Sequence, residues 1–224
     1  MAAISSQVSI AFIFTTFLSL YFFYKGSSSK KALLILIVYM LIVSVLGLNG
    51  FYRKEDALPP RFIFLLLPSL IFIMSLFVTK QGIKFIDSLQ LKWLTLINVI
   101  RIPIEIILYY VFLEGLIPHL MTFVGYNHDI ISGVSAPIIY YLFFVKKKLH
   151  YNVLLIWNIF CLALLVNIVS IAILSAKTPF QQLAFEQPNI GVTYFPLVWL
   201  PAIIVPIVLL SHLVCIRHIL KLKK

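Results

Sequence analysis

The chain has 224 residues, of which 62% are hydrophobic and only 11% are charged. Soluble domains carry about 25% charged residues, so this composition excludes an ordinary soluble domain and indicates an integral membrane protein. The net charge of +11 lies beside hydrophobic runs, which favours membrane orientation and contact with anionic lipid headgroups over nucleic-acid binding.

Seven hydrophobic runs follow one another along the chain, most of them close to the ~20 residues that span a ~30 Å hydrocarbon core. The sequence therefore predicts one all-α polytopic domain, residues 1–224, built as a bundle of about seven transmembrane helices. The first and fifth runs are short, so six or eight crossings stay open as alternatives. The first run lacks a basic start and a cleavage site and is expected to remain as a helix. The runs are 8–24, 32–50, 62–78, 93–118, 130–145, 153–176 and 195–216.

The basic residues are unevenly distributed between the two sides that a seven-span chain would have. Lys and Arg in short loops are retained in the cytoplasm, so the pattern predicts an outer N-terminus, a cytoplasmic C-terminus and contact between the basic side and anionic headgroups. The predicted inner residues are Lys25, Lys30, Lys31, Lys80, Lys84, Lys92, Lys146, Lys147, Lys148, Arg217, Lys221, Lys223 and Lys224, with Asp87. The predicted outer residues are Arg53, Lys54, Arg61 and Lys177, with the acids Glu55, Asp56, Glu114, Asp129 and Glu186.

The longest connections, 51–61, 119–129 and 177–194, all fall on the predicted outer side and suggest a structured cap there. Arg61 opens the third run, where it suits an interfacial anchor or, alternatively, a contact to headgroup phosphates. In the last run Pro201 and Pro206 predict a bent helix, because an interior proline frees the carbonyl four residues before it.

The fourth run places Asn98, Arg101, Glu105 and Tyr109 on one helix face, at spacings of three, four and four. Counted from the start of this run, Arg101 lies about 12 Å and Glu105 about 18 Å into the bilayer. Isolated charges are costly at that depth, so the two are expected to pair and to face the bundle interior. The pair is either a structural strut or part of a cavity that binds an anion or a proton. His212, together with Asn158, falls in the same layer and is a candidate proton relay.

A second polar group lies in the predicted outer connection after the fourth run. It contains His119, Asn127, His128 and Asp129, and Asp129 precedes an apolar run as a helix N-cap would. The two histidines are nine residues apart, which matches no zinc-site spacing, so no metal site is predicted. The sequence contains no phosphate-binding glycine loop, nucleophile elbow or zinc-protease motif and indicates no cofactor. Cys161 and Cys215 lie inside hydrophobic runs, where free buried thiols are expected.

Three segments carry a resemblance to a known family. They are Arg-Ile-Pro-Ile-Glu at 101–105, Pro-His-Leu-Met-Thr-Phe-Val-Gly-Tyr-Asn-His-Asp at 118–129 with Gly133 and Pro137 after it, and the stretch from Trp199-Leu-Pro201 to Ser211-His212-Leu. Together they resemble an uncharacterised family of small bacterial multi-pass inner-membrane proteins, over most of the chain from Asn49 onward. The resemblance implies a location in the bacterial inner membrane and assigns no activity, catalytic residue or cofactor.

Three functions are compatible with these residues. The leading hypothesis is binding or transport of a small or lipidic ligand, with Arg101 holding an anionic group, Glu105 acting as counter-ion or proton acceptor and His212 relaying protons. The alternative is an intramembrane enzyme at the outer leaflet that uses His119, His128 and Asp129. The third is a non-catalytic assembly partner in which the polar residues only fix helix packing.

Overall fold

The computed structural model describes residues 4–54 and 59–222. Within these residues all regular secondary structure is helical, and the only extended pairing is an isolated bridge between Ala176 and Asn189. The predicted all-α class is therefore confirmed. The predicted outer acids Glu55 and Asp56 and the predicted inner residues Lys223 and Lys224 lie outside the described residues.

Five helical segments of the described chain are long and apolar enough to cross a membrane. One of them, Leu91–Leu113, is a continuous helix that contains a short 3-10 stretch. The five are α1 (Ser6–Ser27), α2 (Lys30–Leu48), the segment Leu91–Leu113 formed by α5 (Leu91–Leu96), η2 (Ile97–Ile100) and α6 (Arg101–Leu113), α8 (Tyr151–Leu174), and the segment Leu200–Leu222 formed by η6 (Leu200–Ile204) and α9 (Val205–Leu222).

Two of the seven predicted runs form shorter elements. The third run forms α3 (Ile63–Val78), after which the chain bends by 93° into α4 (Lys80–Ser88). The fifth run forms α7 (Ile130–Tyr140), continued by the π-helical turn η4 (Tyr141–Val145). The remaining elements are single 3-10 turns, namely η1 (Phe51–Arg53), η3 (His119–Met121) and η5 (Gly191–Thr193).

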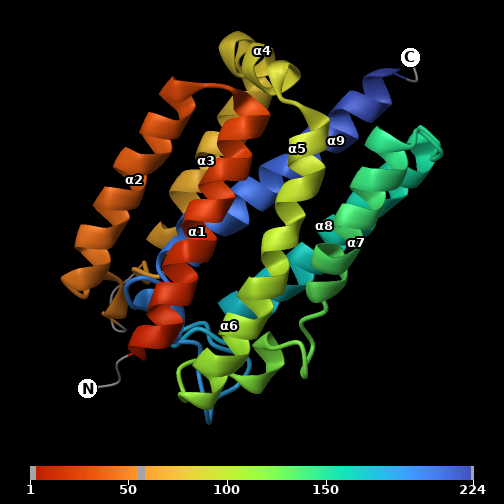
Figure 1. Ribbon diagram of the computed structural model, residues 1–224. Helices are drawn as coiled ribbons and strands as arrows, with labels where there is room; N and C mark the ends of the chain where they lie inside the picture. Colours follow the sequence, from red (N-terminus) through yellow and green to blue (C-terminus); the bar gives the residue numbers. More distant parts are fainter. Residues whose placement is uncertain (1–3, 55–58, 223–224) are drawn as a thin grey trace.

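The helices stand side by side, with α1 against α5 and α6, and with α9 crossing behind them to contact α8, α5 and α3 (Figure 1). Segment Leu200–Leu222 is the most buried of the five long segments and α2 the least. The bundle therefore centres on α9, while α2 lies at the periphery and presents most of its surface to the outside.

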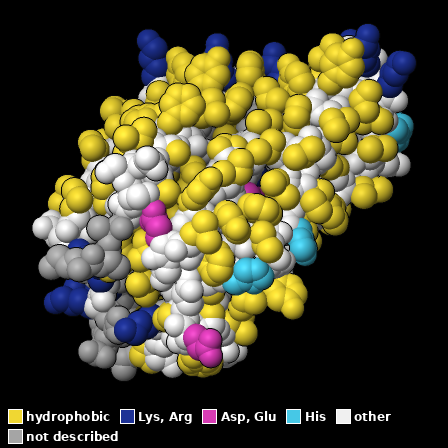
Figure 2. Space-filling view, turned by 60° about the horizontal axis from the view of Figure 1, so that its bottom comes forward, with side chains coloured by type: hydrophobic (Ala, Val, Ile, Leu, Met, Phe, Trp, Pro, Cys, Tyr) yellow, Lys and Arg dark blue, Asp and Glu magenta, His cyan; other side chains and the backbone are white. Residues whose placement is uncertain are grey.

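One end of the bundle holds most of the basic residues. Lys and Arg side chains follow one edge of the molecule, a second and smaller group lies toward the opposite end, and hydrophobic side chains cover much of the surface between them (Figure 2). At the basic end α4 lies across the bundle (Figure 1), and its Asp87 accepts hydrogen bonds from Lys221 and Arg217 of α9 at 2.5 and 3.2 Å. Gln90 donates its backbone N–H to Gly26 at the end of α1.

The long connections meet at the other end and form a cap. The side chain of Gln187 donates to the carbonyls of Phe112 and Ile117 at 3.1 and 2.6 Å. The backbone N–H groups of Ile190 and Gly191 both donate to Leu116. These bonds join the connection after α8 to the end of α6 and the connection after it. The long connections thus form a structured cap.

Proline shapes the buried helix that ends the chain. The helix begins as the π-helical turn η6, which contains Pro201, and Pro206 follows directly in α9. Because Pro206 has no N–H, the carbonyl of Ala202 lacks its usual partner within the helix. The hydroxyl of Ser69 in α3 donates to that carbonyl at 2.7 Å. The freed acceptor thus becomes a contact between two helices.

The N-terminus of α7 lies within the bundle, well away from its ends (Figure 1). This position depends on glycine. A Cβ atom at Gly133 would lie 2.8 Å from Cγ1 of Ile102 and 3.4 Å from Cβ of Arg101. A Cβ at Gly125, in the connection before α7, would lie too close to the carbonyl oxygen of His119. The absence of side chains at these positions lets α7 and its approach pack directly on α6 and η3.

Filling the contact at Gly133 should separate α7 from α6. We expect Gly133→Leu to lower the unfolding free energy by about 1–3 kcal/mol or more, because an overpacked contact forces backbone movement. Val134→Leu is the matched control, since Val134 is 53% exposed. Unfolding of both variants in mixed micelles measures the difference, and equal stability of the two would contradict the close packing.

Asp87 makes the stability of the basic end depend on pH. The hydrogen bond from Lys221 is the main cause of a pKa below the ordinary 3.8 for this carboxyl, and Arg217 contributes. A depressed folded-state pKa gives stability that is present above the unfolded pKa and is lost as the pH falls through the folded value. We expect Asp87→Asn to lower the melting temperature slightly at neutral pH, and the two proteins to converge in acid. Melting curves between about pH 2 and pH 6 test this; a constant difference across that range would contradict it.

Candidate functional site

The central contact of the bundle is an ion pair between α6 and α7. Nη1 of Arg101 lies 2.7 Å from Oδ1 of Asp129, and the side chains are 4% and 7% exposed. Arg101 begins α6, and Asp129 is the residue before α7. Two charges that are 28 residues apart in the sequence therefore neutralise each other inside the protein.

The remaining contacts of Arg101 extend this pair to α8 and α9. The guanidinium also donates to the hydroxyl of Ser132 at 2.9 Å and lies 3.3 Å from Nε2 of His212. Since arginine can only donate, Nε2 accepts, and Nδ1–H of His212 donates to Oδ1 of Asn158 at 2.9 Å. Asn158 is held in this orientation because its amide N–H donates to the carbonyl of Leu154.

Asn127 links Asp129 to the second buried acid. Its Oδ1 accepts the backbone N–H of Asp129 at 3.2 Å, and its Nδ2 donates to Oε1 of Glu105 at 2.6 Å and to the carbonyl of Met121. Glu105 is 2% exposed, and its other oxygen, Oε2, has no hydrogen-bond partner. One carboxylate of the site is thus neutralised by arginine, and the other is only half satisfied.

The expected pairing of Arg101 with Glu105 is wrong. Arg101 pairs with Asp129, and Glu105 receives an amide hydrogen bond from Asn127. Asp129 also differs from a capping residue, because its side chain makes no hydrogen bond to the helix N-terminus and points to Arg101 instead. Arg101 and Glu105 were predicted in a buried site, and Asn127 and Asp129 in an outer site. In the structure these four residues form one network.

Other predicted residues lie apart from this network. Asn98 is buried but donates within its own helix, to the carbonyls of Leu94 and Thr95. Tyr109 packs against Phe123. His119 and His128 are exposed, and no contact described joins either of them to Asp129. Across residues 4–54 and 59–222, no three His, Cys, Asp or Glu side chains lie together so as to hold a metal ion.

A cavity of about 80 Å³ adjoins the buried acid. Most of its wall is apolar, from α6, α8 and η6, and its polar lining residues are Glu105, Asn127, Asp129 and Asn189. Oδ1 of Asn189 is buried and unpaired, as is Oε2 of Glu105. Asn189 was not predicted from the sequence, because it belongs to no charged or periodic pattern.

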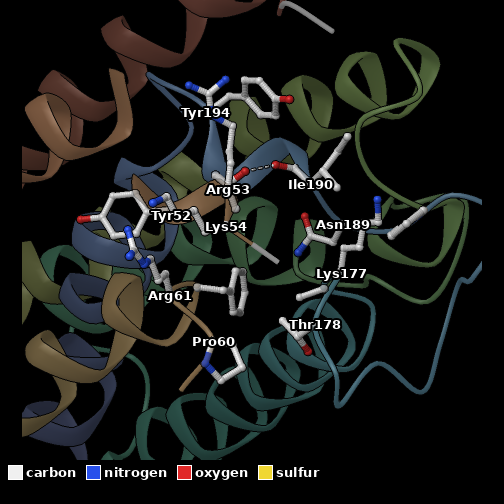
Figure 3. Close-up of a pocket in the computed structure, with 14 residues that line it drawn as sticks. Tyr52, Arg53, Lys54, Pro60, Arg61, Lys177, Thr178, Asn189, Ile190 and Tyr194 are labelled. Carbon is white, nitrogen blue, oxygen red and sulfur yellow. Dashed lines mark hydrogen bonds between the residues drawn. The ribbon is translucent and has the colours of Figure 1, made fainter. Parts of the chain in front are cut away.

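Two larger hollows lie elsewhere on the molecule. A pocket of about 220 Å³ opens in the cap, between the connection after α2 and the connection after α8 (Figure 3). It shares the lining residues Phe62 and Asn189 with the cavity at Glu105. A mostly apolar groove of about 560 Å³ runs between α2, α3 and α9 and has Lys31 in its lining.

Comparison with known proteins identifies the family of this chain. Residues 58–220 match the model of a family described as a domain of unknown function (DUF8737). The chain belongs to this family. The match agrees with the predicted membership of an uncharacterised family, and it includes every residue of the Arg101 network while leaving out α1 and α2. No curated protein and no solved structure matches the chain.

Removal of one partner of the buried ion pair should be strongly destabilising. We expect Asp129→Asn to lower the unfolding free energy by about 3–5 kcal/mol, because the guanidinium of Arg101 is left buried without a counter-charge. Denaturation in mixed micelles measures the loss. Asp87→Asn, which removes an exposed acid from a surface ion pair, should cost no more than about 1 kcal/mol.

A double variant separates the charge effect from packing. Arg101→Met combined with Asp129→Leu removes both charges and should be less destabilised than Asp129→Asn alone, since paired removal leaves no unpaired ion. The matching single variants are Arg101→Met and Asp129→Leu. If their losses of unfolding free energy add up to the loss in the double variant, the two charges are not coupled.

Proposed function

We propose that this chain is a multi-pass protein of the bacterial inner membrane, with its N-terminus outside, that binds a small ligand at the Glu105 cavity as a binding or transport protein. The long apolar helices support insertion in a membrane. The concentration of basic residues at one end supports the orientation, because such residues are retained in the cytoplasm. The family resemblance supports the bacterial membrane.

The single observation that carries the binding role is the unpaired oxygen of Glu105. A buried polar atom without a partner is costly, and each such atom in a folded protein calls for an explanation. Oε2 of Glu105 has no partner, and the residue lines a cavity. A ligand that donates a hydrogen bond or carries positive charge would satisfy this atom.

The rest of the lining narrows the chemistry of the ligand. Asn189 adds a second unpaired acceptor, Oδ1, to the same cavity. The charge of Arg101 is paired with Asp129, and Arg101 is not among the residues that line this cavity. With 80 Å³ available and about 30 Å³ for one water molecule in the liquid, the cavity suits a proton with its water, a metal cation or a small ammonium ion.

The Glu105 cavity lies next to the pocket of the cap. Phe62 and Asn189 line both the Glu105 cavity and the cap pocket, so the two spaces adjoin at these residues. No comparable observation favours an outer-leaflet enzyme, because Asp129 faces Arg101 and both His119 and His128 face outward.

Binding can be tested by ligand-induced stabilisation of the purified full chain. The probes are sodium, ammonium and methylammonium chloride, with choline chloride holding the ionic strength constant. A ligand at 100 times its Kd adds about 2.7 kcal/mol to the stability of the folded protein. We expect one of these cations, or acidification in choline alone, to raise the melting temperature of the wild type saturably and to have no such effect on Glu105→Gln.

Glu186→Gln is the matched control, because it makes the same chemical change on an exposed side chain of the cap. This variant should keep the full response. A response that Glu105→Gln retains, or the absence of any response in the wild type, would contradict the proposed site. Flux of the responding ion in proteoliposomes then separates transport from binding alone.

A further inference from the structure

The cap pocket collects the basic residues of its end of the molecule. All four Lys and Arg residues that the sequence assigns to the outer side are in its lining: Arg53, Lys54, Arg61 and Lys177. Arg53, Lys54 and Arg61 lie on one side of the pocket, and Lys177, Thr178 and Asn189 lie on the other (Figure 3). They come from connections more than 100 residues apart in the sequence, so the fold itself assembles this concentration of positive charge.

Two of the cations are held in place by aromatic rings. The guanidinium of Arg53 lies 4.8 Å from the ring centre of Tyr194, and that of Arg61 lies 4.6 Å from the ring centre of Phe51. Gly50 makes room for Arg53, since a Cβ there would lie 2.7 Å from Nη2. Stacking of this kind orients a guanidinium and leaves its edge N–H groups free to donate.

The described carboxylates do not neutralise these side chains. Over residues 4–54 and 59–222, no ion pair joins an acid to Arg53, Lys54 or Arg61. The other acids of the described cap are engaged or distant. Glu114 accepts the backbone N–H of Ser5, and Glu186 is absent from the pocket lining. Arg53, Lys54 and Arg61 therefore present positive charge to the pocket without an ion-paired acid among residues 4–54 and 59–222.

We propose that the cap pocket is a binding site for a phosphate group. The planar fork of arginine donates paired hydrogen bonds to phosphate oxygens, and two arginines with a lysine match a group of more than one negative charge. The volume of 220 Å³ is below the 300–1,000 Å³ of sites for drug-sized ligands, so it fits a headgroup or a small organic phosphate and excludes a whole lipid.

The phosphate site is separate from the Glu105 cavity of the proposed function, and different charged residues line it. The Glu105 cavity attracts positive charge, whereas the cap pocket attracts negative charge, and the two share only Phe62 and Asn189. Phosphate binding should therefore persist in Glu105→Gln. If only cation binding or only phosphate binding is detected, the proposal for the other site fails.

The phosphate could belong to a lipid or to a soluble molecule, and the experiment has one arm for each source. The purified full chain is titrated with glycerol 3-phosphate by calorimetry in a neutral detergent. Separately, it is placed in nanodiscs of phosphatidylcholine with a minor fraction of phosphatidylglycerol, and native mass spectrometry counts the retained anionic lipid. Both arms compare the wild type with Arg53→Gln, Arg61→Gln and the conservative Arg53→Lys.

We expect saturable binding in at least one arm, weakened at least about tenfold by either glutamine variant, because each loses hydrogen bonds to a charged group. Arg53→Lys should fold normally and bind more weakly than the wild type, since it keeps the charge and loses the fork. Lys84→Gln, at the opposite end, is the matched control and should bind as the wild type does.

The two arms also identify the source of the phosphate. Binding of glycerol 3-phosphate assigns the pocket to soluble phosphates, and selective retention of phosphatidylglycerol alone assigns it to lipid headgroups; each supports the proposal. No saturable binding in either arm, or binding that both glutamine variants retain at wild-type strength, overturns it.

Discussion

The buried ion pair between Arg101 and Asp129 is the contact on which the site depends. A buried arginine requires a counter-charge and acceptors for its remaining donors. Asp129 supplies the charge, Ser132 supplies a hydroxyl, and His212 supplies a ring nitrogen, while Nε of Arg101 has no hydrogen-bond partner. Because these partners come from α7, its N-terminus and α9, the pair fixes how three segments of the bundle meet.

That requirement accounts for several unusual features of the connection before α7. Asp129 can reach Arg101 only if α7 begins inside the bundle, and Gly133 removes the side chain that would prevent this approach. A non-helical backbone at such depth needs its own hydrogen bonds. Asn127 supplies some of them, and Asn167 of α8 donates to the carbonyl of Tyr126 at 2.9 Å. Glu105 then lies beside this connection with one oxygen unsatisfied.

Hydrophobic runs and proline positions predicted the helical class and the irregular last helix, because these follow from composition and local chemistry. They predicted about seven transmembrane helices, of which five are long and apolar enough to cross a membrane in the described chain. The sequence also selected Arg101, Glu105 and His212 as buried polar residues, and it selected Asn127 and Asp129 as part of an outer connection. It could not predict which of these residues form the ion pair and the hydrogen bonds. Spacing along one helix favoured Glu105 as the partner of Arg101, whereas the actual partner lies 28 residues away and meets it through tertiary packing. The position of Lys177 in one pocket with Arg53, Lys54 and Arg61 also depends on tertiary packing, so spacing along the chain could not predict it.

In the proposed membrane location, the short length of α7 would affect the lipid around the protein. Together with η4 it spans 16 residues, about 24 Å at 1.5 Å per residue, against a hydrocarbon core of about 30 Å. The chain just before it exposes Phe123, Val124 and Tyr126. A bilayer adapts to such hydrophobic mismatch by thinning or by letting aromatic side chains replace part of its interface. The annulus of lipid beside α7 should therefore be thinner and less ordered than on the side of α1 and α2, and the protein should prefer membranes with shorter acyl chains.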